Sequence, residues 1–211
     1  VRFSATTSEM SDYISDVAFT PAVKRMQEAK GSRTGYAKLE RKGGWRNEIT
    51  DDLIAFIAKR DSFYLGTASA EGQPYIQHRG GRSGFLKVID KKTLAFADFK
   101  GNRQYISSGN LSENSKAHIF LMDYANRRRV KIWGKARVVD DQEQIKQVSD
   151  EDYPGIPEQA IFFDVLAWDI NCPQHIIPRF TEERIIELVM PLRKRIEELE
   201  TQLKEYSNQS L

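Results

Sequence analysis

The sequence has a single cysteine, Cys172, among its 211 residues. One cysteine can form neither an intramolecular disulfide nor a cysteine metal cage, which suits a reducing compartment, so we expect a cytoplasmic protein. No run of about 18 apolar residues is present, so we expect no membrane-spanning helix and no membrane partner. The polar segment 1–9 lacks the apolar centre of a secretory signal. We expect the natural start at Met10, with an extension before it.

Histidine is also scarce. None of the three, His78, His118 and His175, lies at metal-ligand spacing from another, and there is no His-Glu-x-x-His motif, so we expect no metal site. A phosphate-binding Walker motif and a dinucleotide glycine motif are both missing. Cys172 lies near His175, but no orienting group accompanies this pair as a nucleophile would require. His118 lies in an apolar segment and is interpreted as structural.

Basic and acidic residues are nearly equal in number. Thirty-two basic and 30 acidic residues give a net charge of +2, which does not indicate nucleic acid as a partner. With 40% hydrophobic and 29% charged residues, the chain can bury a core and is not disordered by composition.

Alternating apolar residues and turn signals predict a mainly β fold with flanking helices. The expected strands are 62–69, 74–79, 85–89, 94–99, 116–122, 129–139 and 160–169. The expected helices are 22–30, 50–60, 103–111, 141–149 and 181–206. Because short turns join most of the strands, the sheet should be largely antiparallel and should form a barrel or a sandwich.

Two further segments have distinct patterns. Residues 31–48 are rich in glycine and basic residues and are interpreted as an ordered arm or loop, either a basic flap over an anionic ligand or a solvated loop. In the tail, apolar residues repeat with heptad spacing, which favours self-association. Pro191 should kink or split this tail helix.

Three groups of residues could bind a ligand. In Gln77–Arg82, strand alternation sends Gln77 and Arg79 to one side and His78 to the other, and Gly80 and Gly81 permit close approach. The alternative is an ordinary surface turn.

The second group, Asp98 to Gln104, brings Arg103 and amide groups to a predicted helix start, which is a favourable place for an anion. The alternative is an ordinary helix with Asn102 as its N-cap. In the third, Arg129, Lys131 and Trp133 share one strand face, either as a cationic wall beside a ligand or as a solvated edge.

Five segments together resemble the pyridoxamine 5'-phosphate oxidase-like, FMN-binding split-barrel family, and in particular its branch of flavin-nucleotide-binding proteins. They are residues 61–67, 72–81, 96–104, 126–136 and 168–175. The resemblance implies an antiparallel split barrel with a C-terminal heptad helix. It divides the chain into an N-terminal arm and helix (1–49), the FMN-binding barrel (50–178) and a C-terminal helix that contributes to a dimer (179–211).

The resemblance also implies a cofactor site. In the family, the FMN phosphate and ribityl chain lie against the second and fourth strands. Arg103 matches a basic phosphate ligand, Gln104 and Arg129 replace a lysine and a glutamine of the oxidase, and Trp168 matches a tryptophan that reaches the partner's cofactor. The implied cofactor-binding residues are Gln77, His78, Arg79, Gly80, Gly81, Arg82, Ala97, Asp98, Asn102, Arg103, Gln104, Arg129, Lys131 and Trp168.

The segment 171–175 lacks the Arg-Leu-His motif with which the oxidase holds its vitamin B6 substrate. We therefore expect a homodimeric FMN-dependent oxidoreductase with another substrate and an electron donor such as NAD(P)H. His78 and His175 are the candidate acid or base residues. Two alternatives remain open: a flavin- or nucleotide-binding protein without turnover, and a haem-binding barrel with a histidine ligand.

Overall fold

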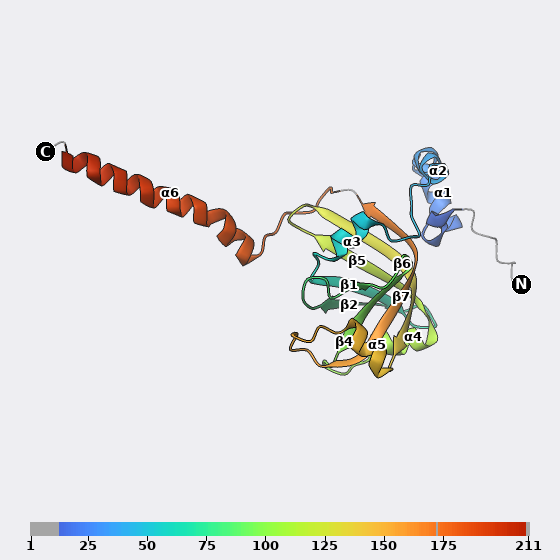
Figure 1. The fold of residues 1–211 in the computed structure, drawn as a ribbon. Coiled ribbons are helices and arrows are strands. Elements are labelled where there is room, and N and C mark those ends of the chain that lie inside the picture. The colour runs from blue at the N-terminus through green and yellow to red at the C-terminus, as the bar shows by residue number, and fades with distance from the viewer. Residues whose placement is uncertain (1–12, 172, 210–211) are drawn as a thin grey trace, which may run out of the picture. The chain divides into compact units, whose positions relative to one another are not determined.

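A computed structural model describes residues 13–171 and 173–209. Its contacts form two compact units, and Figure 1 shows the elements of both. One unit holds the sheet, with the described residues up to Asp123 and those from Arg128 to the end of the last strand. The other holds Tyr124–Arg127 and the described residues from Pro173 onward. The predicted start at Met10 and the cysteine of the Cys172–His175 pair lie outside the described residues.

Seven strands form one sheet in the order β2-β1-β5-β6-β7-β4-β3, and every pairing is antiparallel. The elements in chain order are η1 (Ile14–Val17), α1 (Pro21–Ala29), α2 (Arg33–Arg41), α3 (Asp51–Ile57), β1 (Ser62–Ala68), β2 (Pro74–Gly80), β3 (Lys87–Val88), β4 (Thr93–Phe99), α4 (Ile106–Glu113), β5 (Lys116–Asp123), β6 (Arg128–Val139), α5 (Gln142–Val148), β7 (Pro157–Asn171) and α6 (Glu182–Gln209). The predicted antiparallel split barrel with flanking helices is confirmed.

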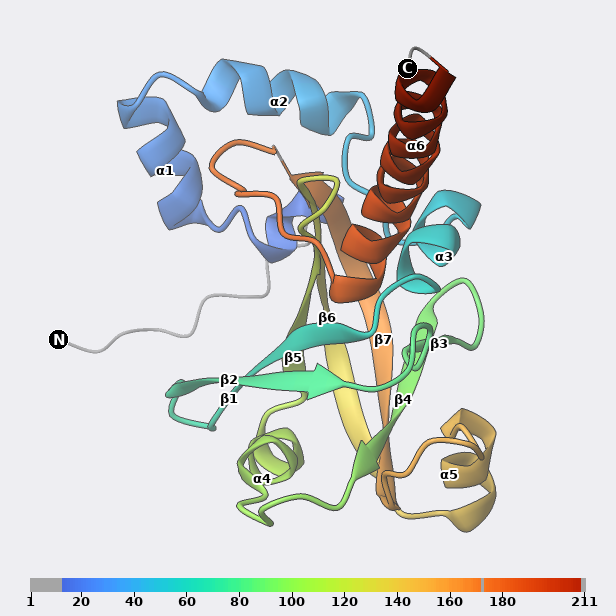
Figure 2. The ribbon, with the colours of Figure 1, turned by 90° about the vertical axis from the view of Figure 1, so that its left-hand side faces the viewer.

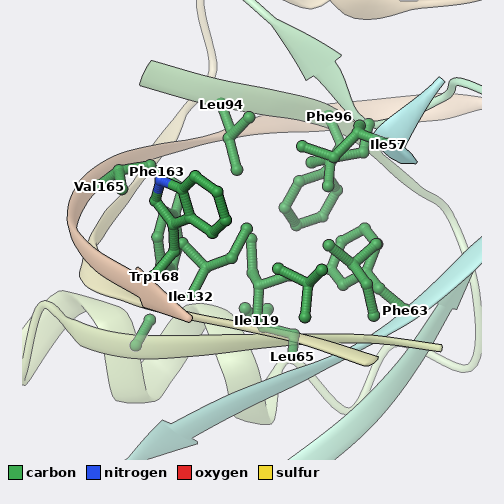
Figure 3. Packing of buried hydrophobic residues seen from close by; sticks show 14 of the residues in the cluster. Ile57, Phe63, Leu65, Leu94, Phe96, Ile119, Ile132, Phe163, Val165 and Trp168 are labelled. Carbon is green, nitrogen blue, oxygen red and sulfur yellow. The ribbon is translucent and has the colours of Figure 1, made fainter. Parts of the chain in front are cut away.

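The interior of the barrel is apolar. Alternate residues of β5 and β6 point inward, so that Ile119 and Ile132 are fully buried while their neighbours lie at the outer face. Figure 3 shows side chains from opposite walls pointing toward one another, with Phe63, Phe96 and Phe163 among them. Burying one such side chain contributes about 1.5–3 kcal/mol, so this cluster dominates the stability of the barrel.

The curled sheet brings two of its strands together across the barrel. Arg79 on β2 forms an ion pair with Asp98 on β4, although several strands separate β2 from β4 in the sheet. On the outer face of β4 and β7, the small side chains of Ala97 and Ala160 pack with Phe162 against α5. Figure 2 shows α4 and α5 near the ends of the strands, and the polar site described below lies beside α4.

Two predictions about elements were wrong, and a third is settled only in part. Residues 31–48 contain the helix α2. Within this helix Arg33 pairs with the buried Glu40, and Ser15 of η1 donates a hydrogen bond of 3.0 Å to the same carboxylate, which is a tertiary contact. The predicted strand 85–89 is only two residues long, because Phe85 and Leu86 turn into the core. Pro191 does not split the tail helix, because α6 runs through it as one element; the kink stays a prediction.

Aromatic rings attach the N-terminal helices to the sheet. Phe19 lies 5.1 Å from Trp45, and Trp45 stacks on Trp133 of β6 at 4.7 Å between ring centroids. These contacts make the N-terminal segment part of the sheet unit. Among the described residues, no helix combines the length and the apolar character that crossing a bilayer would require.

Candidate functional site: a polar hollow between β2, β4 and α4

A polar hollow lies where β2 and the end of β4 meet the loop before α4. Its cavity is small, ≈ 50 Å³, which is room for a few water molecules or a phosphate group but not for a flavin ring. Six of the predicted site residues line it: Gln77, Arg79, Asp98, Asn102, Arg103 and Gln104. The structure therefore brings together the first two groups of residues that the sequence singled out.

The floor of the hollow is a hydrogen-bonded network around Asp98. This carboxylate is 8% exposed, pairs with Arg79, and accepts a hydrogen bond of 2.7 Å from Gln159 Nε2. Gln159 also donates to Ser108 Oγ at 2.6 Å. Arg79 Nε is buried and has no hydrogen-bond partner among the described residues, so this side chain retains an unused cationic donor.

The wall of the hollow is formed by a second network. Arg103 Nε donates to the hydroxyl of Tyr105 at 3.0 Å, and that hydroxyl donates to Glu158 Oε1 at 2.8 Å. The hydrogen bond to Tyr105, together with the charge of Glu158, raises the pKa of Arg103, so the guanidinium stays charged. On the opposite wall, Ser107 Oγ donates to Gln77 Oε1 at 2.7 Å.

The loop before α4 has an uncommon backbone. Arg103 and Tyr105 have φ of 60° and 53°, in the left-handed region that non-glycine residues rarely occupy. Such strain is found where the surrounding structure enforces it, often at ligand sites. Here it turns the polar groups of the loop toward the hollow that they line.

The start of the helix differs from the prediction. The helix α4 begins at Ile106 with Tyr105 as its N-cap, so Arg103 does not lie at a helix start and Asn102 is not the N-cap. Instead, Asn102 Oδ1 accepts a hydrogen bond of 3.3 Å from the backbone N–H of Gln104, which is an Asx turn. Arg103 therefore lies three residues before α4, and the first turn of that helix borders the hollow through Ile106, Ser107 and Ser108.

Five predicted residues of β2, the turn after it and β4 do not line the hollow, Gly80 among them. His78 points to the other face of β2, where its ring lies 5.7 Å from that of Tyr64. Ala97 is buried against α5. A Cβ on Gly81 would lie 2.7 Å from Phe85, so glycine at this position lets the ring of Phe85 pack into the core. Arg82 is exposed and donates to the backbone carbonyl of Asp152 at 2.7 Å.

Gly80, the last residue of β2, does not line the hollow either. A Cβ on Gly80 would lie 3.2 Å from the ring of His78, the side chain on the other face of the strand. Both glycines of the predicted group are therefore explained by neighbouring side chains of this chain.

The third predicted group lies on the outer face of β6. Lys131 pairs with Asp169 at 3.4 Å and lies 5.2 Å from the centroid of Trp133. Burial raises the pKa of Asp169, and Lys131 partly offsets that effect. Arg129 Nε is buried without a hydrogen-bond partner among the described residues. The expected sharing of one face by Arg129, Lys131 and Trp133 is confirmed.

Two other predicted residues lie elsewhere. Trp168 points into the barrel core, is 4% exposed, and donates from Nε1 to the backbone carbonyl of Glu48 at 2.7 Å. Its buried position does not bring it to the hollow. His175 belongs to the second unit, where it is exposed and has φ of 61°.

The outer face of the sheet carries an apolar hollow of ≈ 480 Å³ that the sequence did not indicate. It is lined by Tyr64, Gly66, Ile76, His118 and Phe120. Burial lowers the pKa of His118 from 6.5 to about 4, with a further contribution from Lys131. His118 is therefore neutral at neutral pH. The described residues contain no group of three or more side chains suited to a metal ion.

Sequence reasoning missed five residues that form the hydrogen-bond networks of the hollow: Tyr105, Ser107, Ser108, Glu158 and Gln159. The first three follow the predicted loop and were interpreted as ordinary helix residues. Two of the five come from β7, far along the chain. In the local sequence, only the neighbouring hydroxyl residues Ser107 and Ser108 indicated that polar side chains face the loop.

The fold and the site define an antiparallel split-barrel protein with a polar hollow at one end. The family model described as pyridoxamine 5'-phosphate oxidase matches residues 49–168, which is more than half of the chain. The chain therefore belongs to the pyridoxamine 5'-phosphate oxidase family, as the resemblance implied.

Solved structures share parts of the fold at low identity. A HupZ variant from Group A Streptococcus is 18% identical with a TM-score of 0.48, covering 58% of this chain and 99% of its own. A pyridoxinephosphate oxidase-family protein from Clostridium acetobutylicum, related to general stress protein 26, is 17% identical with a TM-score of 0.41, covering 60% and 89%. An FMN-binding protein from Syntrophomonas wolfei is 12% identical with a TM-score of 0.41, covering 69% and 97%. No curated protein matches the sequence significantly.

Proposed function

We propose that this protein binds FMN and that the polar hollow holds the phosphate end of the cofactor. The family suggests a flavin, and the donor set fits its phosphate. Arg103 is exposed in the hollow, and its terminal nitrogens have no hydrogen-bond partner among the described residues. A guanidinium with free terminal nitrogens can bind two phosphate oxygens at once. This open guanidinium, fixed through Tyr105, is the observation that carries the proposal.

The charge of the hollow is balanced rather than strongly positive. Arg79 already has Asp98 as a partner, and Glu158 lies beside Tyr105 and Arg103. A phosphate must therefore compete with two carboxylates for the same cations. The hydroxyls of Ser107 and Ser108, which also line the hollow, can donate to phosphate oxygens after rotating. We expect an affinity set by hydrogen-bond geometry as much as by net charge.

The flavin ring needs a surface beyond the hollow, because a cavity of ≈ 50 Å³ cannot hold it. In this proposal the ring lies outside the hollow and is covered by a second copy of the chain, so the active form is a homodimer. Bound FMN would supply hydride or electron transfer, and the protein would bind it, orient it and exclude water. NAD(P)H is the proposed electron donor.

The test is a titration of cofactor-free protein with FMN and, separately, with riboflavin, which lacks the phosphate. Flavin fluorescence reports binding, and the mass of the ligand extracted from freshly purified protein identifies the natural occupant. We expect FMN to bind at least tenfold more tightly than riboflavin, and inorganic phosphate to compete with FMN. Equal affinities for the two flavins would overturn the phosphate site.

A binding protein without turnover is the second candidate. One of the two proposed histidines, His78, points to the other face of β2 and not into the hollow. NAD(P)H-dependent bleaching of the bound flavin distinguishes the two functions. Bleaching with multiple turnovers supports the oxidoreductase, whereas a flavin that stays oxidised supports the binding protein.

Haem binding is a third candidate, favoured by the outer apolar hollow. Its ≈ 480 Å³ falls within the range of about 300–1,000 Å³ typical of ligand pockets, and His118 in its wall is neutral, the form that ligates iron. An absorption spectrum recorded after adding hemin decides it. A Soret band that His118→Ala removes would support haem, and a spectrum of free hemin would exclude it.

A further inference from the structure

The helix α6 presents a continuous apolar stripe. Seven residues follow one another at alternating intervals of four and three, which places them on one side of the helix. They are Ile185, Val189, Leu192, Ile196, Leu199, Leu203 and Tyr206. All but Val189 are between 42% and 75% exposed. Water contact over such a stripe is unfavourable, so the stripe is suited to burial against another surface.

The residue types along the stripe indicate what covers it. In heptad terms, Val189, Ile196 and Leu203 occupy the a positions, and Leu192 and Leu199 occupy d positions between them. Parallel two-stranded coiled coils favour β-branched residues at a and leucine at d. Val189 and Ile196 are β-branched, and both central d residues are leucine, so this pattern favours a second copy of α6 in parallel.

The charges beside the stripe agree with that arrangement. Arg195 occupies a g position and Glu200 the next e position. In a parallel, in-register pair, Arg195 faces Glu200 of the partner subunit, and by symmetry the same contact forms twice. Within one helix, Arg195 pairs with Glu198 at 3.1 Å and is 60% exposed in its side chain, so it is available for a contact across the interface.

Pro191 does not oppose the pairing. It occupies a c position, on the side of α6 away from the stripe, and the helix continues through it. Its ring therefore does not enter the seam, although it removes one backbone hydrogen bond of the helix.

We propose that α6 pairs in parallel and in register with α6 of a second copy, as a two-stranded coiled coil. The pairing depends on the apolar stripe and on Arg195 and Glu200, not on the flavin. It is therefore a separate contact from any that encloses a cofactor at the barrel.

Disulfide trapping of the full chain tests both the direction and the register. In a Cys172→Ser background, the variants Leu192→Cys and Leu199→Cys each place a cysteine at d, and Thr201→Cys places one at the outward f position. We expect the first two to form a disulfide-linked dimer as the major species under mild oxidation and the third to remain unlinked. An antiparallel pair can bring at most one of the two d positions opposite itself.

Cross-linking at only one d position, or at neither, would overturn the parallel pairing, as would equal cross-linking at residue 201. Sedimentation of the reduced Cys172→Ser chain provides a second measurement. A dimer mass is expected, whereas a monomer or a trimer would contradict two strands. FMN titration of Ile196→Lys/Leu199→Lys separates this inference from the flavin proposal, because loss of α6 pairing leaves the hollow intact.

Discussion

Arg103 combines a strained backbone with an open side chain, which makes it the most informative single residue of the hollow. We expect Arg103→Ala to weaken FMN binding roughly tenfold to a hundredfold, because one charge-assisted hydrogen-bonding group is lost. The fold should persist because the side chain is exposed. Flavin fluorescence during titration measures the affinity, and circular dichroism checks the fold.

The control for Arg103→Ala is Arg25→Ala, which removes an exposed arginine of α1 outside the hollow. It has the same effect on net charge and should leave the affinity unchanged. The affinity of both variants for riboflavin should match that of the unmodified protein. An Arg103→Ala protein that binds FMN as tightly as Arg25→Ala would contradict the phosphate role.

Glu158 offers a prediction of opposite sign. Its carboxylate accepts a hydrogen bond from Tyr105 and places a negative charge beside the proposed phosphate. Glu158→Gln keeps an oxygen acceptor for Tyr105 but removes that charge, so FMN should bind about two- to tenfold more tightly, since an exposed charge contributes about 1 kcal/mol. Riboflavin affinity should stay the same. Weaker FMN binding would show that Glu158 positions Arg103 more than it repels the phosphate.

At the scale of an element, β6 contains an irregularity at which one added methyl group should lower the stability of the protein. The register between β6 and β7 shifts at Trp133/Gly134, and a Cβ on Gly134 would collide with the carbonyl of Asp164 and the ring of Phe163. Both neighbours are fixed in the sheet, so Gly134→Ala should destabilise the protein by about 3 kcal/mol or more. Urea unfolding measures this loss.

Gly35→Ala is the matched control. Gly35 lies in α2, and no atom lies within 4 Å of the position that its Cβ would take. The same substitution there should stabilise the protein by about 0.5–1 kcal/mol, because alanine loses less backbone freedom than glycine in a helix. Similar changes at the two positions would contradict close packing at Gly134.

The sequence predicts the elements that local patterns determine. Alternation and turn signals located six of the strands, and the proline after Thr20 located α1, where Thr20 Oγ1 accepts from Val23 N–H. Long-range contacts determine the rest. The helix α2 depends on Glu40, whose carboxylate accepts a hydrogen bond from Ser15 of another segment, and α4 begins late because Arg103 and Tyr105 adopt left-handed conformations.

The candidate site also combines residues that local patterns predict with residues that only long-range contacts bring together. Strand alternation correctly placed Gln77 and Arg79 on one side of β2, and both line the hollow. Gln77 is held by Ser107 of α4 and Arg79 by Asp98, which in turn is held by Gln159 of β7; Ser107 and Gln159 have no local signature. Trp168 points inward because the pairing between β6 and β7 shifts at Trp133/Gly134 of β6. Alternation within one strand does not reveal such a shift.

At the scale of the whole molecule, His118 couples stability to pH. Its pKa is about 4 in the folded protein, chiefly because of burial, against 6.5 for the ordinary side chain. Between these values the unfolded chain binds more protons than the folded one, so the stability is fully present above pH 6.5 and falls as the pH drops toward 4. The shift corresponds to at most about 3 kcal/mol.

We therefore expect His118→Gln to flatten the loss of stability on acidification. Urea unfolding at pH 7, 5.5 and 4 should show a decrease in the free energy of unfolding for the unmodified protein that exceeds the decrease for His118→Gln by about 1–3 kcal/mol. Asp169 titrates in both proteins, so its contribution largely cancels in the comparison. His78→Gln, which replaces an exposed histidine, serves as the control and should retain the steep dependence. If His118→Gln were as sensitive to acid as His78→Gln, the buried neutral state of His118 would not be the source of the effect.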